Sequence, residues 1–196
     1  MSQRPVNSAR TRLWAGVDLG GTGTRVAIVN DDGVDVAGAT VPTATFERHA
    51  IEALSDLIRG LVSEDAELAG VGIGASGPID LTTGLIHNPD TLPQFSGLSV
   101  ASGLERELSA PTWIDNDAVV AGLAENTWGA AAIAASVLCV TLGTGVGAVM
   151  IHGGRPVRAP DGQTPKGVTS RLARAGSPCY LRSLECLARE TSWLPR

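Results

Sequence analysis

The residues best suited to chemistry stand between two short apolar runs near the start of the chain. Residues 18–25 (DLGGTGTR) separate the apolar runs 13–17 and 26–29. Two such runs joined by Gly and Thr predict a buried hairpin. Glycines lack a Cβ, so their N–H groups approach an anion closely, and Thr hydroxyls add donors. We therefore predict a phosphate-binding turn, with an ordinary Gly-rich turn as the alternative. Its residues are Gly20, Gly21, Thr22, Gly23 and Thr24.

The same turn predicts a metal ion and excludes two common nucleotide motifs. Asp18 ends the first predicted strand, where a carboxylate can hold Mg²⁺ directly or through water. The turn lacks the Gly-Lys-Ser/Thr of a Walker loop. A strand rather than a helix is predicted to follow it, which excludes a Rossmann fingerprint.

A second apolar hairpin repeats the pattern later in the chain. Residues 136–142 and 146–151 flank another Gly-Thr-Gly. Two copies of one hairpin predict two like-built halves that close on one polyphosphate. The second phosphate site would contain Gly143, Thr144, Gly145 and Gly147.

Polar residues also follow two predicted strands at their carboxyl ends. Ser76 and Gly77 come directly after the apolar strand 69–75, at the position where open α/β sheets bind ligands; a plain turn is the alternative. Asn116 and Asp117 lie between the strand 111–115 and a helix that runs to Trp128. Either could cap that helix. With Asp115 they exceed the need of a cap, so we expect at least one to face a cleft.

The elements that must position these residues alternate between strands and helices, which predicts an α/β fold. A third strand is expected over 34–41 and a small hairpin over 80–86. Apolar residues at helical spacing predict helices over 46–62, capped by Thr45, and over 99–108, capped by Ser99.

Composition excludes several classes of protein. The 196 residues carry a net charge of −5 and only 4% aromatics, which argues against nucleic-acid binding. Three cysteines form no disulfide framework, so we expect a reducing, cytoplasmic compartment. Residues 1–12 lack a signal peptide and are expected to be a disordered lead. Residues 128–152 lack Asp, Glu, Lys and Arg, but a Gly turn divides them, so we predict two buried strands rather than a membrane span.

Four motifs, in order, resemble the ROK family of sugar kinases (repressor, open reading frame, kinase). They are residues 18–25 (DLGGTGTR), 72–80 (GIGASGPID), 115–118 (DNDA, with Ala124-Glu125 on the same helix) and 142–147 (LGTGVG). The resemblance implies an actin-like ATPase (ribonuclease H-like) domain over 13–128. An incomplete second actin-like domain with a degenerate tail would occupy 129–196.

The resemblance also implies a role for each candidate residue. Asp117 would be the general base that takes the proton of a sugar hydroxyl, and Asn116 would bind a sugar hydroxyl. Ser76 and Gly77 would line the sugar pocket. The two glycine hairpins would hold the phosphates of ATP, with Asp18 near Mg²⁺.

The sequence departs from the family pattern after residue 162. Lys166 stands where the family has Glu, and Thr169 where it has the His that also joins a zinc site. Of that site only Cys179 and Cys186 match, and two thiolates do not complete a tetrahedral zinc centre. We therefore expect ordinary thiols and no zinc. The chain ends at Arg196, before the part that holds adenine in the family, so we expect a truncated second domain.

Two functions are predicted on this basis. The first is ATP-dependent phosphorylation of a hexose, glucose or a close relative. The second is a catalytically impaired remnant that binds sugar or nucleotide. The sugar, its reacting hydroxyl, and ATP against polyphosphate as donor stay open, as does monomer against homodimer. The family's repressors carry an N-terminal helix-turn-helix, whereas only about a dozen residues precede the first predicted strand here, so no DNA binding is expected.

Overall fold

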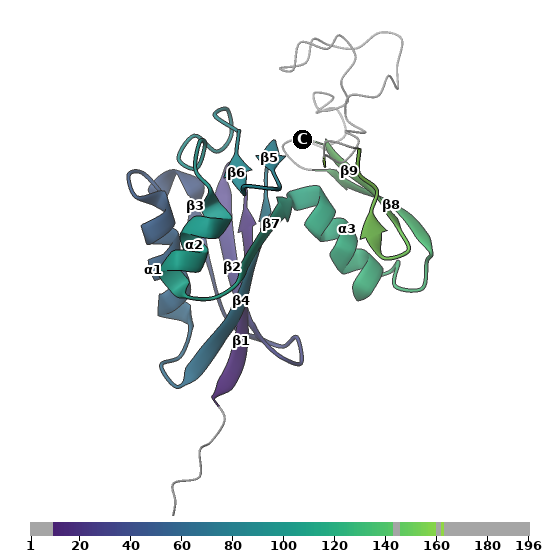
Figure 1. Cartoon of the computed structure of the whole chain (residues 1–196). Helices are drawn as coiled ribbons and strands as arrows, with labels where there is room; N and C mark the ends of the chain where they lie inside the picture. The colour runs from purple at the N-terminus through teal and green to yellow at the C-terminus, as the bar shows by residue number, and fades with distance from the viewer. Residues whose placement is uncertain (1–9, 143–145, 160–161, 163–196) are drawn as a thin grey trace, which may run out of the picture. The chain divides into compact units, whose positions relative to one another are not determined.

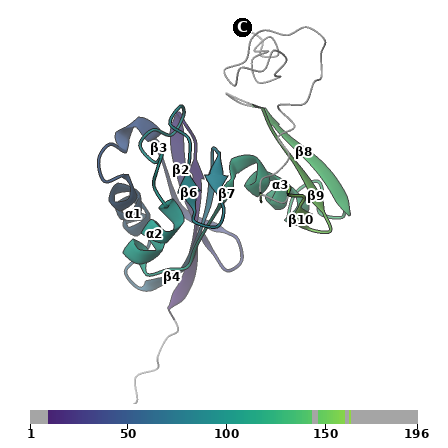
Figure 2. The same ribbon diagram turned by 45° about the horizontal axis from the view of Figure 1, so that its top comes forward.

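The computed structural model describes residues 10–142, 146–159 and 162. The chain forms two compact units that divide between Asp115 and Asn116, and each is described by itself (Figures 1 and 2). The predicted boundary after Trp128 therefore lies inside the second unit. The predicted lead 1–12 has its last residues in a strand, which begins at Thr11.

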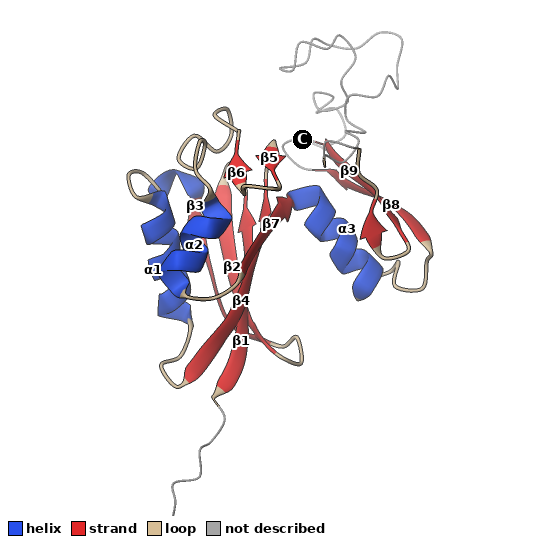
Figure 3. Ribbon diagram, viewed as in Figure 1, coloured by secondary structure: helices blue, strands red, loops and turns tan. Residues whose placement is uncertain are grey.

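The first unit is built on a five-stranded sheet in the order β3-β2-β1-β4-β7 (Figure 3). The first three strands form the two antiparallel hairpins that the sequence predicts. β4 then pairs with β1 in parallel. The strands are β1 (Thr11–Leu19), β2 (Gly23–Asn30), β3 (Asp35–Pro42), β4 (Ala66–Ala75) and β7 (Thr112–Asn116).

Two helices lie side by side on one face of this sheet, as the views in Figures 1 and 2 agree. They are α1 (Ala50–Leu61) and α2 (Val100–Leu108). Their fully buried residues Leu54, Ile58 and Leu104 belong to one core with Val71 and Ile73 of β4. Two two-residue strands, β5 (Ile79–Asp80) and β6 (Leu85–Ile86), form the small hairpin expected between the helices.

The first helix begins four residues later than predicted. Thr45 belongs to a short 3-10 turn, η1 (Thr43–Thr45), and its hydroxyl donates to the Pro42 carbonyl at 2.7 Å, so it does not cap α1. Phe46 stays outside the helix because its ring is buried against Phe95, with centroids 5.4 Å apart. His49 takes the N-cap position instead, in a left-handed conformation with φ of 63°. Ser99 is the N-cap residue of α2, as predicted, but its side chain makes no capping bond.

The second unit packs one helix on one hairpin. It contains α3 (Asp117–Thr127), β8 (Ser136–Leu142), β9 (Val146–His152) and β10 (Arg155–Pro156), with the strands in the order β10-β9-β8. Val119 of α3 is buried with Val149 and Ile151 of β9. Gly122 makes this approach feasible, since a Cβ there would lie 2.5 Å from Val149 Cγ1. This packing explains why α3 belongs to the second unit.

The uncharged stretch 128–152 contains the predicted hairpin, but β8 is not buried on both faces. Leu138, Val140 and Leu142 are 66%, 51% and 78% exposed, while the alternate residues face α3. The prediction of two buried strands is thus wrong for one face of β8 and for Met150 of β9, which is 49% exposed. Among the helices that the structure describes, none has the length and apolar character required to span a membrane.

The packing of α1 on α2 gives a test at glycine. A Cβ on Gly103 of α2 would lie 2.5 Å from Ile51 Cδ1, whereas one on Gly60 of α1 would meet nothing within 4 Å. Alanine gains helix propensity at both sites, up to about 1 kcal/mol. We expect Gly60→Ala to stabilise the chain by about 0.5 kcal/mol and Gly103→Ala to destabilise it by about 1–2 kcal/mol, because crowding in a packed contact outweighs propensity. Urea unfolding of the two variants measures the difference, and equal gains would contradict this packing.

Candidate functional site

The first glycine turn joins β1 to β2 over residues 20–23. β1 ends at Leu19, β2 begins at Gly23, and the Gly20 N–H donates to the Gly23 carbonyl at 3.2 Å. Gly21 and Thr22 at the tip are exposed. The turn therefore presents its tip, with the glycine N–H groups an anion would need, at the end of a paired hairpin.

Thr43 braces this turn from the side. Its Oγ1 donates to the Gly20 carbonyl at 2.5 Å, and its N–H donates to the Thr22 carbonyl at 3.2 Å. The Thr43 and Thr24 hydroxyl oxygens lie 2.9 Å apart, and both residues are fully buried. The Thr24 hydroxyl, which the sequence analysis predicts to donate to phosphate, is therefore buried against Thr43 and not exposed at the tip of the turn. No local pattern in the sequence marked Thr43, which is 23 residues from Gly20.

Asp18 is a surface carboxylate beside the same turn. It forms an ion pair with Arg25, the residue opposite it on β2, at 3.0 Å, and both side chains are more than half exposed. Within the described residues no three His, Cys, Asp or Glu side chains gather as a metal site. Magnesium often binds proteins through one carboxylate, with phosphates and water as its other ligands. Asp18 therefore fits a magnesium site that phosphates and water complete, and the described residues around it do not form a site made of protein ligands alone.

The end of β4 lies next to the end of β1, because the two strands pair in parallel with Ala75 opposite Leu19. The Ser76 N–H donates to the Leu19 carbonyl at 3.2 Å, so this second turn starts beside the glycine turn. Ser76 and Gly77 are half-buried. The structure thus brings the predicted sugar residues and the predicted phosphate turn to one edge of the first unit's sheet.

A carboxylate four residues further on closes the small hairpin. Asp80 Oδ1 accepts N–H donors from Thr82 at 2.8 Å and from Thr83 at 3.3 Å. The Thr82 N–H is the main cause that lowers the pKa of Asp80, followed by the Thr83 side chain. Asp80 therefore has a structural task in its own turn.

Asn116 and Asp117 stand where β7 passes into α3. Asn116 is the N-cap residue, and its Oδ1 accepts the Ala118 N–H at 3.1 Å, which confirms the capping alternative. Asp117 Oδ1 accepts the same N–H at 2.8 Å. Both residues are half-buried. The main chain thus orients one carboxylate oxygen of Asp117 at the N-terminus of a helix.

The second glycine turn lies largely outside the described residues, which omit Gly143, Thr144 and Gly145. Gly147 lies opposite Thr141 in the β8–β9 pair. A Cβ on Gly147 would lie 2.4 Å from Thr141 Oγ1 and 2.7 Å from the Ala118 Cβ. Gly147 therefore lets the start of α3 pack closely on this hairpin, one residue from Asp117. Lys166, Thr169, Cys179 and Cys186 also lie outside the described residues.

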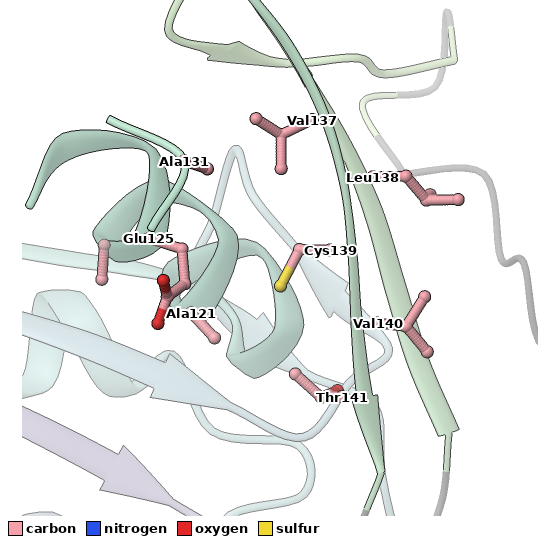
Figure 4. A pocket seen from close by; sticks show the side chains of 9 residues that line it. Ala121, Glu125, Ala131, Val137, Leu138, Cys139, Val140 and Thr141 are labelled. Atoms are coloured by element: carbon pink, nitrogen blue, oxygen red, sulfur yellow. The ribbon is translucent and has the colours of Figure 1, made fainter. Parts of the chain in front are cut away.

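A cavity of about 560 Å³ opens between α3 and β8 (Figure 4). Most of its lining is Ala and Val, and Glu125 supplies the charged group. Glu125 Oε2 accepts the Ala130 N–H at 3.1 Å and so organises the turn after α3. None of the predicted site residues lines this cavity, and the sequence analysis did not predict it.

Comparison with known proteins identifies the family. A sequence model described as the ROK family matches residues 14–188. The chain belongs to the ROK family. The match extends past the last resembling motif and includes the positions where the sequence departs from the family pattern.

Several relatives of this ROK chain are sugar kinases by name. A glucokinase of Halalkalibacterium halodurans is 31% identical in an alignment of 183 positions that covers 90% of this chain and 55% of that protein. A ROK hexokinase from Thermus thermophilus has a TM-score of 0.77 at 29% identity, covering 90% of this chain and 59% of that one. A ROK glucokinase from Streptomyces griseus, solved with glucose and AMPPNP, has a TM-score of 0.75 at 28% identity, covering 89% and 55%.

These matches confirm the predicted actin-like α/β fold for the part of the chain that they cover. The chain spans about half the length of the curated relatives it matches.

The brace at Thr43 predicts the effect of removing one hydroxyl. Thr43→Val keeps the shape of the side chain but leaves the Thr24 hydroxyl and the Gly20 carbonyl without this buried partner. We expect a loss of about 1–3 kcal/mol in unfolding free energy, because unsatisfied buried polar groups are costly. Thr43→Ser keeps the hydroxyl and serves as the control in urea denaturation. A serine variant less stable than the valine variant would contradict the brace.

The Asp80 turn predicts a pH dependence. A carboxyl with a lowered folded-state pKa adds stability above its unfolded pKa, about 3.9, and loses it as pH falls through the folded value. We expect the Asp80 side-chain ¹³C resonance to titrate with a midpoint below that of an aspartate in the unfolded chain. In Thr83→Val the midpoint should rise, because one hydrogen-bond donor to the charged form is gone. An unchanged midpoint in this variant would show that the hydroxyl has no part in the shift.

Proposed function

We propose that this chain carries the acceptor and phosphate-binding elements of an ATP-dependent hexose kinase that acts on glucose or a close relative. Glucokinases and a ROK hexokinase are among its relatives, and one similar structure was solved with glucose and an ATP analogue. The observation that carries the proposal is the Asp117 carboxylate, which the main chain orients at the start of α3.

Asp117 would act as the general base. A sugar hydroxyl is a poor nucleophile at neutral pH, so a nearby carboxylate that accepts its proton favours attack on the γ-phosphorus. Asn116, the preceding residue, would bind a neighbouring sugar hydroxyl and fix the reacting one. Such positioning supplies much of the catalysis in phosphoryl transfer.

The backbone N–H groups at the exposed tip of the first turn, Gly21 and Thr22, would bind phosphate oxygens, together with those of the Gly143–Gly147 turn, while the Gly20 N–H closes the first turn on the Gly23 carbonyl. Thr22, exposed at the tip of the first turn, is the side chain there suited to add a hydroxyl donor. The buried hydroxyl of Thr24 would support the turn through Thr43 instead. When bound beside Asp18, Mg²⁺ would neutralise charge on the phosphates.

Ser76 and Gly77 would form the wall of the sugar site in the first unit. They start from the same sheet edge as the glycine turn, since the Ser76 N–H binds the last carbonyl of β1. A sugar held by this turn would therefore lie near phosphates held by the glycine turn.

The second candidate function is binding of sugar or nucleotide without turnover. The substitutions Lys166 and Thr169 favour it, because the family places a Glu and a sugar-binding His there. Three further choices need their own measurements. Polyphosphate in place of ATP tests the phosphate donor, analysis of the product identifies the reacting hydroxyl, and the mass in solution tests for a homodimer.

A coupled assay of the purified chain with several hexoses and Mg-ATP decides between these functions. We expect hexose-dependent ADP release that falls about 10²–10⁴-fold in Asp117→Asn, because that side chain no longer accepts a proton. Asp56→Asn, an exposed change on α1, is the matched control and should keep full activity. Thermal stabilisation by hexose or AMPPNP without ADP release would support the binding remnant. Full activity in Asp117→Asn would refute the role of this carboxylate.

A further inference from the structure

Asn88 is one of the few buried polar side chains of the first unit, with 7% of its surface exposed. Its Nδ2 amide lies 3.1 Å from the Ser76 carbonyl, 3.0 Å from the Gly77 carbonyl and 2.6 Å from Thr91 Oγ1. Its Oδ1 accepts the Thr91 N–H at 3.0 Å. One side chain thus connects the turn after β4 to the loop that begins at residue 87.

Thr91 in turn lies against the glycine turn. A Cβ added to Gly21 would lie 2.9 Å from the Thr91 carbonyl oxygen and 3.0 Å from its Cβ. Real Cβ atoms essentially never approach other atoms so closely, so Thr91 can lie this close only because residue 21 has no Cβ. The path from Ser76 through Asn88 and Thr91 therefore reaches the tip of the phosphate turn.

Buried side chains and backbone hydrogen bonds hold in place the loop that contains Asn88 and Thr91. Leu92 and Phe95 are fully buried in the core of the first unit. The Leu92 N–H donates to the Asn88 carbonyl at 3.1 Å, and the His87 N–H donates to the Pro78 carbonyl at 2.8 Å. These contacts fix the main chain around Asn88, and its side-chain amide hydrogen-bonds to the turn after β4.

We propose that Asn88 is a positioning residue that sets the Ser76–Gly77 turn and the Gly20–Gly23 turn in register with each other. This inference rests on the proposed function for its consequence, since those two turns would hold the acceptor sugar and the phosphates. A carboxamide suits the task because its NH₂ group binds carbonyls while its oxygen binds an N–H. No carboxylate or hydroxyl offers two donor hydrogens and an acceptor together.

Asn88→Asp is the sharpest variant because it changes one NH₂ to oxygen at constant shape. Aspartate keeps the acceptor for the Thr91 N–H but places a second acceptor against the Ser76 and Gly77 carbonyls. Repulsion there should free the turn after β4, while the Asn88–Thr91 loop keeps its own bond. Asp90→Asn, an exposed change two residues away in the same loop, is the matched control.

Hydrogen exchange of the whole chain, followed by mass spectrometry, provides the readout that does not depend on activity. The Ser76 N–H, bonded to Leu19, and the Gly20 N–H, bonded to Gly23, report on the two turns. In Asn88→Asp we expect exchange over 74–80 and 18–25 to accelerate about tenfold or more, as loss of buried hydrogen bonds lowers the cost of local opening. Asp90→Asn should change it less than twofold. Faster exchange confined to 86–95 would overturn the proposal.

A second variant covers the case in which Asn88→Asp does not fold. Gly21→Ala changes an exposed turn residue and leaves Asn88 intact, but its Cβ must push Thr91 away. We expect faster exchange over 86–95 as well as over 18–25. An unchanged 86–95 segment would show that the two turns are not connected through Thr91.

Ligand measurements separate this inference from the proposed function. If the wild-type chain phosphorylates glucose, Asn88→Asp should raise KM for glucose at least tenfold, with a smaller effect on kcat, because the sugar wall is displaced while Asp117 is untouched. An unchanged KM with accelerated exchange would overturn the link to the sugar site. If the wild-type chain neither binds nor turns over hexose, the exchange result still decides whether Asn88 positions the two turns, and the proposed function alone fails.

Discussion

The arrangement of the first unit depends on β1 being paired on both of its edges. β2 pairs with it antiparallel and β4 pairs with it parallel, so Leu19 lies opposite Thr24 on one side and opposite Ala75 on the other. The β1–β2 turn and the turn after β4 must therefore begin next to each other, at the carboxyl ends of β1 and β4. The Ser76 N–H bonded to the Leu19 carbonyl is the direct result. Strand pairing, rather than any single side chain, brings the two candidate binding turns together.

Side chains then fix what pairing alone leaves loose. Thr43 hydrogen-bonds to the glycine turn and Thr91 packs closely on it, and these residues come from the segments that follow β3 and β6. The two contacts make different demands on sequence. The contact with Thr43 requires a hydroxyl that donates to the Gly20 carbonyl, whereas the contact with Thr91 requires that residue 21 has no Cβ. The turn therefore needs glycine for packing at the same residue where a phosphate would need close approach of the backbone.

Gly147 repeats this double use in the second unit. Its missing Cβ leaves room for the Thr141 hydroxyl and for Ala118, the residue after Asp117. The glycine pattern that marks a phosphate hairpin is thus also a pattern of close packing. This explains why such a motif in a sequence supports both an anion-binding interpretation and a structural one, and why ligand measurements must separate them.

The sequence predicted what depends on local periodicity and failed where partners are distant. Alternating and helical apolar spacing gave the strands of both hairpins and the helices α1, α2 and α3 at nearly the observed positions. The start of α1 was misplaced because Phe46 packs on Phe95, a residue 49 positions away that no local pattern reveals. Thr43 and Asn88 were missed for the same reason. Each looks like an ordinary loop residue until its partners, 23 and 12 residues distant, are known.

The hairpin of the second unit shows a different limit. In β8 the residues that face α3 and those that face away are both apolar, which is the composition of a strand covered on two sides. In the described part of the chain only α3 covers it, and Leu138, Val140 and Leu142 stay exposed. β1, the strand in the matching place of the first hairpin, also has one buried face, with Ala15, Val17 and Leu19, but Arg12, Gly16 and Asp18 on its other face are exposed and include two charged side chains. An apolar sequence thus records that a strand face requires cover, but it carries no information about which segment supplies that cover.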